Sequence, residues 1–175
     1  MDVIRCIKTR HSCRSFNSKK IDENEINQIL DAAIAAPSGK NGQPWRFSVI
    51  SDSTTINEIS KLSIYGHWMK DANKFICVYL DKKNSYHYVK DVQSCGAAIQ
   101  NILLTARALG IETCWIGEIL AKSDEVMDLL ELDNARYELM AVIVLGHSDT
   151  DTTKVIDKEI DNFILNASGE MLCTE

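Results

Sequence analysis

Two arginines and a serine alternate near the start of the chain, at Arg10, Ser12 and Arg14. In an extended segment, residues two apart point to the same side, so two guanidinium groups and a hydroxyl would face one ligand. Arginine forks match the oxygen atoms of phosphate bidentately, which favours an anion-binding segment. The alternative is a solvated basic turn, and the residues alone favour neither interpretation.

The distribution of charge supports a role for this segment. Residues 1–20 contain six of the 19 basic residues and a single acidic residue, although the whole chain has a net charge of −6. An acidic protein that concentrates its cations at one end is expected to use them on an anionic ligand. The overall acidity disfavours a general nucleic-acid binder.

A second segment with unusual composition is AAPSGKNGQPW, residues 35–45, which contains both prolines of the chain. Glycine, asparagine and proline predict a tight, ordered loop. It would present Ser38, Asn41 and Gln43 between a helix and a strand, where binding loops commonly lie. At eleven residues it is longer than a typical connection, which favours function over a plain connector.

The elements that must position these segments follow from periodicity and capping residues. Asp22 and Glu25 predict a capping box at the start of an apolar helix that Pro37 ends. Gly110 is a C-terminal helix signal, and Ser123 is expected to cap a short helix. The expected helices span 2–10, 22–36, 54–63, 88–109, 123–130 and 156–165, and the expected strands span 45–50, 75–80, 111–117 and 137–145. This order predicts one layered α+β or α/β domain, residues 1–175, around a sheet of about four strands.

Several common chemistries lack their motifs. The chain has no G-x-G-x-x-G after a strand, no phosphate loop, no G-x-S-x-G and no H-E-x-x-H. Its six cysteines and four histidines lack metal-ligand spacing, so no metal site is expected. Cys13 lies between His11 and Arg14, and we favour a packing role over a reactive thiol.

The expected compartment is the cytoplasm. No apolar run reaches the roughly 18–20 residues that a membrane span needs, and the N-terminal residues do not resemble a secretory signal. We therefore expect reduced thiols and no membrane partner.

The two segments together, in this order, resemble the nitroreductase family of flavin enzymes. The family's basic stretch R-[RH]-S-x-[RK]-x-F is similar to residues 10–16, and its A-P-S-x-x-N-x-Q-P-W loop is similar to residues 36–45. Residues 91–117 resemble the family's long central helix and following strand, and residues 145–149 resemble the end of its last core strand. The chain looks like a short member of this family.

The resemblance implies an α+β fold with a largely antiparallel sheet of four to five strands, and an intertwined homodimer with FMN at the subunit interface. It implies that Arg10 and Ser12 hold the FMN phosphate with His11 nearby, and that Arg14 faces the pyrimidine edge of the flavin. The residues that it places at the ring are Pro37, Ser38, Gly39 and Asn41 of the other subunit and Ile116, Gly117 and Glu118. Lys154 or Lys158 is the candidate to complete the phosphate site.

The activity that the resemblance implies is hydride transfer from NADH or NADPH, through flavin N5, to a nitroaromatic, quinone or similar acceptor. The flavin carries that chemistry, so no catalytic side chain is required, and Arg14 and Gly117 would tune it. Two alternatives stay open: a specialised family reaction, such as dehalogenation or flavin or azoline chemistry, and a non-catalytic flavin- or corrin-binding module.

Overall fold

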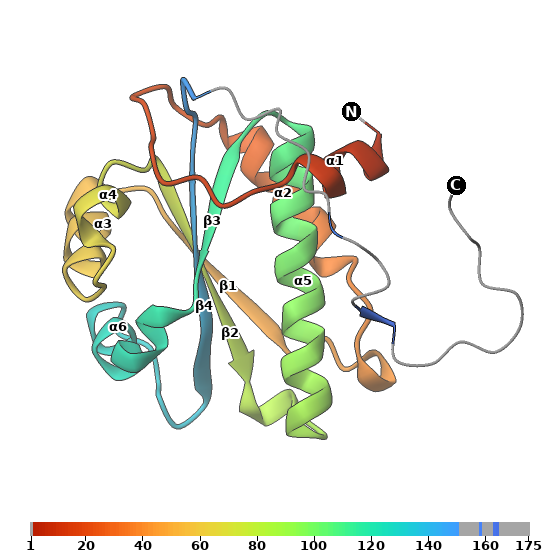
Figure 1. Ribbon diagram of the computed structural model, residues 1–175. Coiled ribbons are helices and arrows are strands. Elements are labelled where there is room, and N and C mark those ends of the chain that lie inside the picture. Colours follow the sequence, from red (N-terminus) through yellow and green to blue (C-terminus); the bar gives the residue numbers. More distant parts are fainter. Residues whose placement is uncertain (1, 151–157, 159–162, 165–175) are drawn as a thin grey trace, which may run out of the picture.

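The computed structural model describes residues 2–150, 158 and 163–164. Helices and strands alternate along most of the chain, and the longest helix, α5, runs alongside the sheet (Figure 1). The helices are α1 (Val3–Thr9), α2 (Glu23–Ile34), α3 (Ser53–Lys61), α4 (Gly66–Met69), α5 (Tyr88–Ala108) and α6 (Ser123–Leu129). The strands are β1 (Trp45–Ile50), β2 (Lys74–Asp81), β3 (Glu112–Ile116) and β4 (Tyr137–Gly146), and three short 3₁₀ helices are η1 (Gly39–Asn41), η2 (Lys82–Asn84) and η3 (Glu118–Lys122).

The four strands form one antiparallel sheet in the order β1-β2-β4-β3. The expected α+β fold with an antiparallel sheet of about four strands is therefore confirmed. The register shifts once, between Val78 and Tyr79, where β2 pairs with β4. Strands β2 and β4 are central and β2 is buried along its whole length, which explains their nearly continuous apolar sequences.

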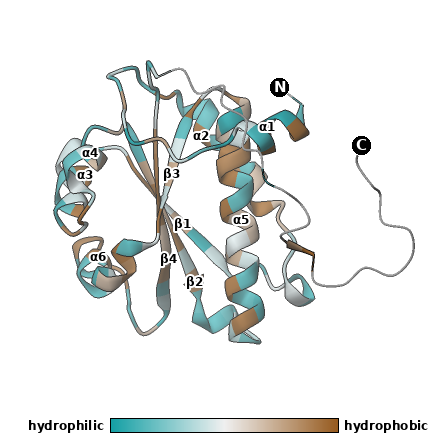
Figure 2. Cartoon of the chain, viewed as in Figure 1, coloured by the Kyte–Doolittle hydropathy of each residue, from teal (hydrophilic) through white to brown (hydrophobic). Residues whose placement is uncertain are grey.

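Helices cover both faces of the sheet. Residues of α2 and α5 pack on one face against alternate residues of β2 and β4, such as Ile76 and Ile143. Residues of α3, α4 and α6 pack on the other face, against Phe75 and Val144. Figure 2 shows apolar residues along the central strands and along much of α5, and polar residues in many of the connecting loops. The period of two along each strand thus divides its side chains between two apolar layers.

Most predicted helix boundaries are confirmed. The Asp22 side chain accepts from a backbone N–H and the Glu25 side chain accepts from the Asp22 N–H, so the capping box is present. Gly110 ends α5 with a φ of 77°, in the region that favours glycine. The prediction for Ser123 was wrong: α6 begins at Ser123 itself, its cap position is Lys122, and no side chain caps it.

The expected helix over 156–165 falls largely outside the described residues. Within the described part of the chain, no helix has the length and hydropathy required to cross a membrane.

Candidate functional site

The basic segment lies beside strand β3, which is an edge strand of the sheet. The Cys13 N–H donates to the Thr113 carbonyl at 2.9 Å, so the segment extends the sheet by one contact. Cys13 is buried, while Ser12 and Arg14 on either side of it are exposed. The predicted alternation is present, and the packing role for Cys13 is confirmed.

The guanidinium groups of Arg10 and Arg14 have no carboxylate partner among the described residues. Arg14 donates to the Ser12 carbonyl at 3.3 Å. Burial raises the pKa of the Cys114 thiol on β3, and the rise is opposed by Arg14, by the Ser12 hydroxyl and by Arg10. The two guanidinium groups and the Ser12 hydroxyl therefore lie near the Cys114 thiol on β3. Two cations without a carboxylate partner in the described part of the chain, beside a hydroxyl donor, favour an anion.

A network of hydrogen bonds and ion pairs connects the residues on either side of Arg10 to α5 and β3. Arg107 of α5 donates through Nη1 to Glu112 Oε1 at 2.6 Å and through Nε to the Thr9 hydroxyl at 3.1 Å. His11 Nε2 lies 3.4 Å from Glu112 Oε2, and His11 Nδ1 lies 3.2 Å from the Thr9 carbonyl. Thr9 and His11, the two residues that flank Arg10, are thus fixed to the end of α5 and the start of β3.

The other end of β3 presents open backbone. Ile116 is buried and Gly117 is exposed. A Cβ atom at Gly117 would meet only Trp115 Nε1, at 3.9 Å, so a flat group can approach the backbone there. The Glu118 carboxylate accepts from the Ser63 hydroxyl at 2.7 Å, which anchors η3 to the loop between α3 and α4. At about 3.3 Å per residue, β3 separates Thr113 from Gly117 by about 13 Å.

The second predicted segment forms a tight loop, as expected. The Ser38 hydroxyl accepts from the Gln43 N–H at 3.0 Å, and the Gly39 N–H donates to the Ser94 hydroxyl of α5 at 3.4 Å. Asn41 and Pro37 are exposed. A cavity of about 410 Å³ opens between this loop and α5, lined by Pro37, Ser38, Gly39, Lys90, Gln93, Ser94 and Ala97.

The two predicted halves of the site do not meet within one chain. The loop contacts α5 at Ser94, whereas the basic segment is fixed to α5 at Arg107, thirteen residues further along. At 1.5 Å per residue these contacts are about 20 Å apart. Figure 1 likewise shows the N-terminal segment and the loop before β1 near opposite ends of α5.

The role of Lys154 and Lys158, the candidates to complete the phosphate site, stays a prediction. Lys154 lies outside the described residues. The Lys158 ammonium lies 5.7 Å from the ring centroid of Phe163.

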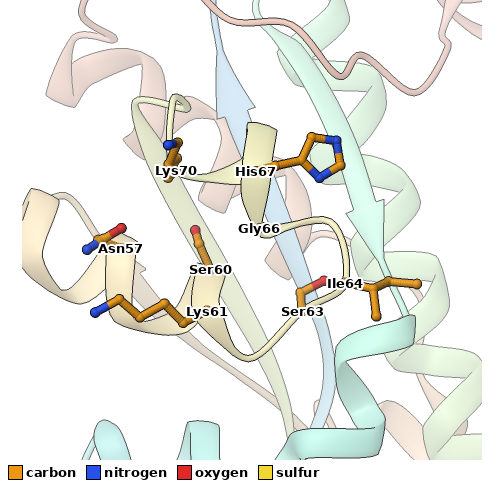
Figure 3. Close-up of a pocket in the computed structure, with 8 residues that line it drawn as sticks. All are labelled: Asn57, Ser60, Lys61, Ser63, Ile64, Gly66, His67 and Lys70. Carbon is orange, nitrogen blue, oxygen red and sulfur yellow. The ribbon is translucent and has the colours of Figure 1, made fainter.

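A different cavity, of about 390 Å³, lies between α3 and α4 and is lined by Asn57, Ser60, Lys61, Ser63, Ile64, Gly66, His67 and Lys70. It contains cationic residues, but Figure 3 shows Lys61 and His67 pointing away from each other. Lys61 is also paired with Glu58 at 2.6 Å. The Lys61 ammonium and the His67 ring therefore do not converge on one ligand.

The model of the Nitroreductase family matches residues 7–65 and 61–147. The chain belongs to the nitroreductase family. A nitroreductase-family relative from Archaeoglobus fulgidus, provisionally named NADH dehydrogenase/NAD(P)H nitroreductase, is 38% identical over 149 residues, which cover 83% of this chain and 85% of the relative.

Solved structures of the family have the same fold. A provisionally named nitroreductase from Desulfovibrio desulfuricans, in complex with FMN, superposes with a TM-score of 0.90 at 34% identity and covers 97% of this chain and 99% of that chain. The NADPH:FMN oxidoreductase of Vibrio harveyi, complexed with NAD⁺, has a TM-score of 0.83 at 19% identity, covering 99% of this chain and 79% of its own.

Sequence reasoning missed some residues around these segments. Arg107 and Glu112 are far from Arg10 in sequence, and no local pattern indicates that a helix end and a strand start meet there. The sequence also did not predict that Lys90 and Tyr86 lie together beside the loop. The spacing of Lys90, Gln93 and Ser94 on one helix face was the available signal.

Proposed function

We propose that this nitroreductase-family protein is an FMN-dependent oxidoreductase that takes hydride from NADH or NADPH and passes it to a nitroaromatic, a quinone or a similar electron-poor acceptor. The names of its relatives support the reaction class: one from Bacillus subtilis, 24% identical, is an FMN reductase [NAD(P)H]. The Desulfovibrio desulfuricans structure, at 34% identity, holds FMN.

The observation that carries the proposal is the pair of uncompensated guanidinium groups beside β3. A flavin phosphate needs cations and hydrogen-bond donors, and Arg10 with the Ser12 hydroxyl supplies both. Of the other arginines, Arg46, Arg107 and Arg136 each have a carboxylate partner. Arg10 and Arg14 therefore fit the phosphate end of FMN and the edge of its ring, while the open backbone at Gly117 fits the ring itself.

FMN, when bound, supplies the hydride acceptor and donor, so the protein supplies position and charge. Arg14 holds a fixed positive charge where the reduced ring would carry negative charge, and it thereby favours reduction. The backbone at 116–118 is held by β3 and by the Ser63–Glu118 hydrogen bond, so its N–H groups keep their direction. The Arg107–Glu112 pair keeps Arg10 in place through Thr9 and His11.

We also propose that two copies of the chain build each site. The loop with Ser38 and the segment with Arg10 contact α5 at points about 20 Å apart. In one chain, Ser38 therefore cannot cover the ring of a flavin whose phosphate Arg10 of the same chain binds. The surface supports a homodimer, because α1 exposes the apolar side chains of Val3, Ile4 and Ile7. Around Gly96, a Cβ atom would meet nothing within 4 Å, so a second helix can approach α5 closely.

The remaining parts of the proposal concern extent and compartment. We take residues 1–175 as one domain. We place the protein in the cytoplasm, which is supported by the free, buried state of Cys6, Cys13, Cys77, Cys95 and Cys114.

The direct test is the visible spectrum of the purified protein, followed by anaerobic titration with NADH and NADPH. A yellow protein whose flavin band is bleached by either nucleotide is expected. A colourless protein that stays free of flavin when FMN is supplied would overturn the proposal, and a yellow protein that neither nucleotide bleaches would indicate a flavin-binding module.

Two variants test the assignment of residues. Arg14→Ala should weaken FMN binding and slow flavin reduction, and unchanged values would refute its placement. Ser38→Trp should lower FMN retention while the monomer still folds, as judged by circular dichroism. Normal retention in Ser38→Trp would contradict a site shared between subunits.

A further inference from the structure

Two lysines flank one aromatic ring beside the cavity between the 35–45 loop and α5. The Lys40 ammonium lies 4.9 Å and the Lys90 ammonium 5.6 Å from the centroid of the Tyr86 ring. Neither lysine has a carboxylate partner among the residues that the structure describes, in a chain whose net charge is −6. We name these residues the Lys40–Tyr86–Lys90 cluster.

The ring holds the ammonium groups without neutralising them. The face of an aromatic ring attracts a cation through its quadrupole, but it carries no net charge. A carboxylate partner would cancel the field of each lysine, whereas the Tyr86 ring leaves that field available to a third group. The cluster therefore attracts anions.

The ring itself is fixed by two features of the fold. The buried Asp91 carboxylate accepts from the Ser85 hydroxyl at 2.7 Å and from the Tyr86 N–H at 3.0 Å, which sets the backbone direction. On the loop side, a Cβ atom at position 39 would lie 2.5 Å from the Tyr86 hydroxyl oxygen. A side chain at position 39 would push the Tyr86 ring away, so the glycine lets the ring rest against the loop.

The loop that carries Lys40 is strained. Lys40, Asn41 and Gln43 have φ values of 53°, 55° and 47°, and among the described residues the only other non-glycine residue with a positive φ is Glu131. Such conformations cost about 1–3 kcal/mol each and persist where the surroundings enforce them, often at ligand sites. The strain is concentrated on the residues that bring Lys40 to Tyr86.

We propose that the Lys40–Tyr86–Lys90 cluster binds the anionic group, a carboxylate or a phosphate, of a small organic substrate. The cavity beside it has a volume of about 410 Å³ and is widely open to solvent, and its lining combines Pro37 and Ala97 with the polar side chains of Ser38 and Gln93. The proposal rests on the proposed function, because the same loop would cover a flavin of the partner subunit. It specifies the substrate class of that site: anionic acceptors or the phosphates of the nucleotide, in preference to neutral compounds.

The first experiment compares two acceptors that differ only in charge, 4-nitrobenzoate and 4-nitrobenzamide, in the flavin-loaded dimer with NADH in excess. Lys40→Gln and Lys90→Gln should each raise KM for 4-nitrobenzoate about three- to tenfold and change KM for 4-nitrobenzamide less than about twofold. Tyr86→Leu should act in the same direction, because it removes the ring that holds both lysines. Lys61→Gln, at an exposed lysine of α3 on the opposite face of the sheet from α5, is the matched control and should change neither KM.

A second arm identifies the source of the anion. If the lysine variants raise KM for NADH or NADPH and leave 4-nitrobenzoate unchanged, the nucleotide phosphates occupy the cluster. An equal change for the charged and the neutral acceptor, with nucleotide KM unchanged, would overturn the proposal and leave the lysines with a purely structural role.

A binding measurement separates this proposal from the proposed function. Equilibrium dialysis of 4-nitrobenzoate against the purified protein should show weaker binding in the Lys40→Gln/Lys90→Gln double variant, and binding should fall as salt is raised. If the purified protein takes up no FMN, the proposed redox function fails. The dialysis result would still show whether the Lys40–Tyr86–Lys90 cluster binds an anion. Equal binding of both 4-nitrobenzoate and NADPH by the wild type and the double variant, measured in the same way, would refute the anion site whether or not flavin is present.

Discussion

Glu112→Gln should destabilise the protein strongly, because it removes the carboxylate charge that lies 2.6 Å from the buried Arg107 guanidinium. The side chains of Arg107 and Glu112 are 10% and 9% exposed, and their 2.6 Å contact is shared with Thr9 and His11. Removing one partner of such a pair costs about 3–5 kcal/mol, chiefly through the charge that stays buried. For a chain of this size that corresponds to a fall in Tm of about 6–20 °C.

The same substitution on an exposed pair is the control. Glu58 and Lys61 are also 2.6 Å apart, but their side chains are 43% and 59% exposed, so Glu58→Gln should cost at most about 1 kcal/mol. Both substitutions thus remove a carboxylate from an ion pair of 2.6 Å, and the two pairs differ in how far they are buried.

The assay is urea unfolding followed by circular dichroism, with protein and FMN concentrations held constant because ligand and dimer binding both stabilise the folded state. The double variant Arg107→Met/Glu112→Gln should recover part of the loss, since it removes the guanidinium charge together with the carboxylate. The reasoning fails if Glu112→Gln costs no more than Glu58→Gln, or if the double variant is as unstable as the sum of the two single variants.

Three further outcomes are expected. The hydrogen-bonded Arg136 guanidinium holds the pKa of the Asp81 carboxyl below its usual value of 3.8. Asp81 therefore contributes stability that is present above pH 3.8 and is lost as the pH falls through the lowered pKa. The difference in urea midpoint between the wild type and Asp81→Asn should shrink from about pH 6 to about pH 3, and a constant difference would contradict this. Gly146→Ala should cost about 1–3 kcal/mol in urea unfolding and lower FMN affinity, because a Cβ there would lie 2.6 Å from the Phe16 ring that ends the basic segment; a stability equal to wild type would show that the ring moves freely. Burial raises the pKa of the Cys95 thiol to about 12, so Ellman's reagent at about pH 8 should modify Cys95 only after denaturation, as peptide mapping would report, and fast labelling in the native state would refute its burial.

Much of the fold was predictable from local sequence. The Asp22 capping box, the Gly110 helix end and the strand at 45–50 are each decided within a few residues, and the structure has all three. Ser123 was misread because a serine before an apolar run is equally compatible with the first helical turn, where it lies.

The site was predictable only in part. The alternation of Ser12 and Arg14 around a buried Cys13 follows from period two. The pairing of Arg107 with Glu112 and its contact with Thr9 depend on how α5 crosses the start of β3, which local patterns do not contain. The same holds for Tyr86 and Lys40, which lie 46 residues apart in sequence and meet through the close packing at Gly39.

The hydrogen bond from the Cys13 N–H to the Thr113 carbonyl covers part of the β3 edge and thereby affects the tendency of the protein to aggregate. Strand β3 is at the edge of the sheet, and an uncovered edge is a template on which a second copy can add a strand. The segment with Ser12 and Arg14 lies along this edge and places a charge there, which opposes such pairing. Loss of the first sixteen residues would therefore be expected to promote aggregation of the remaining chain, so proteolysis at this end would threaten solubility as well as cofactor binding.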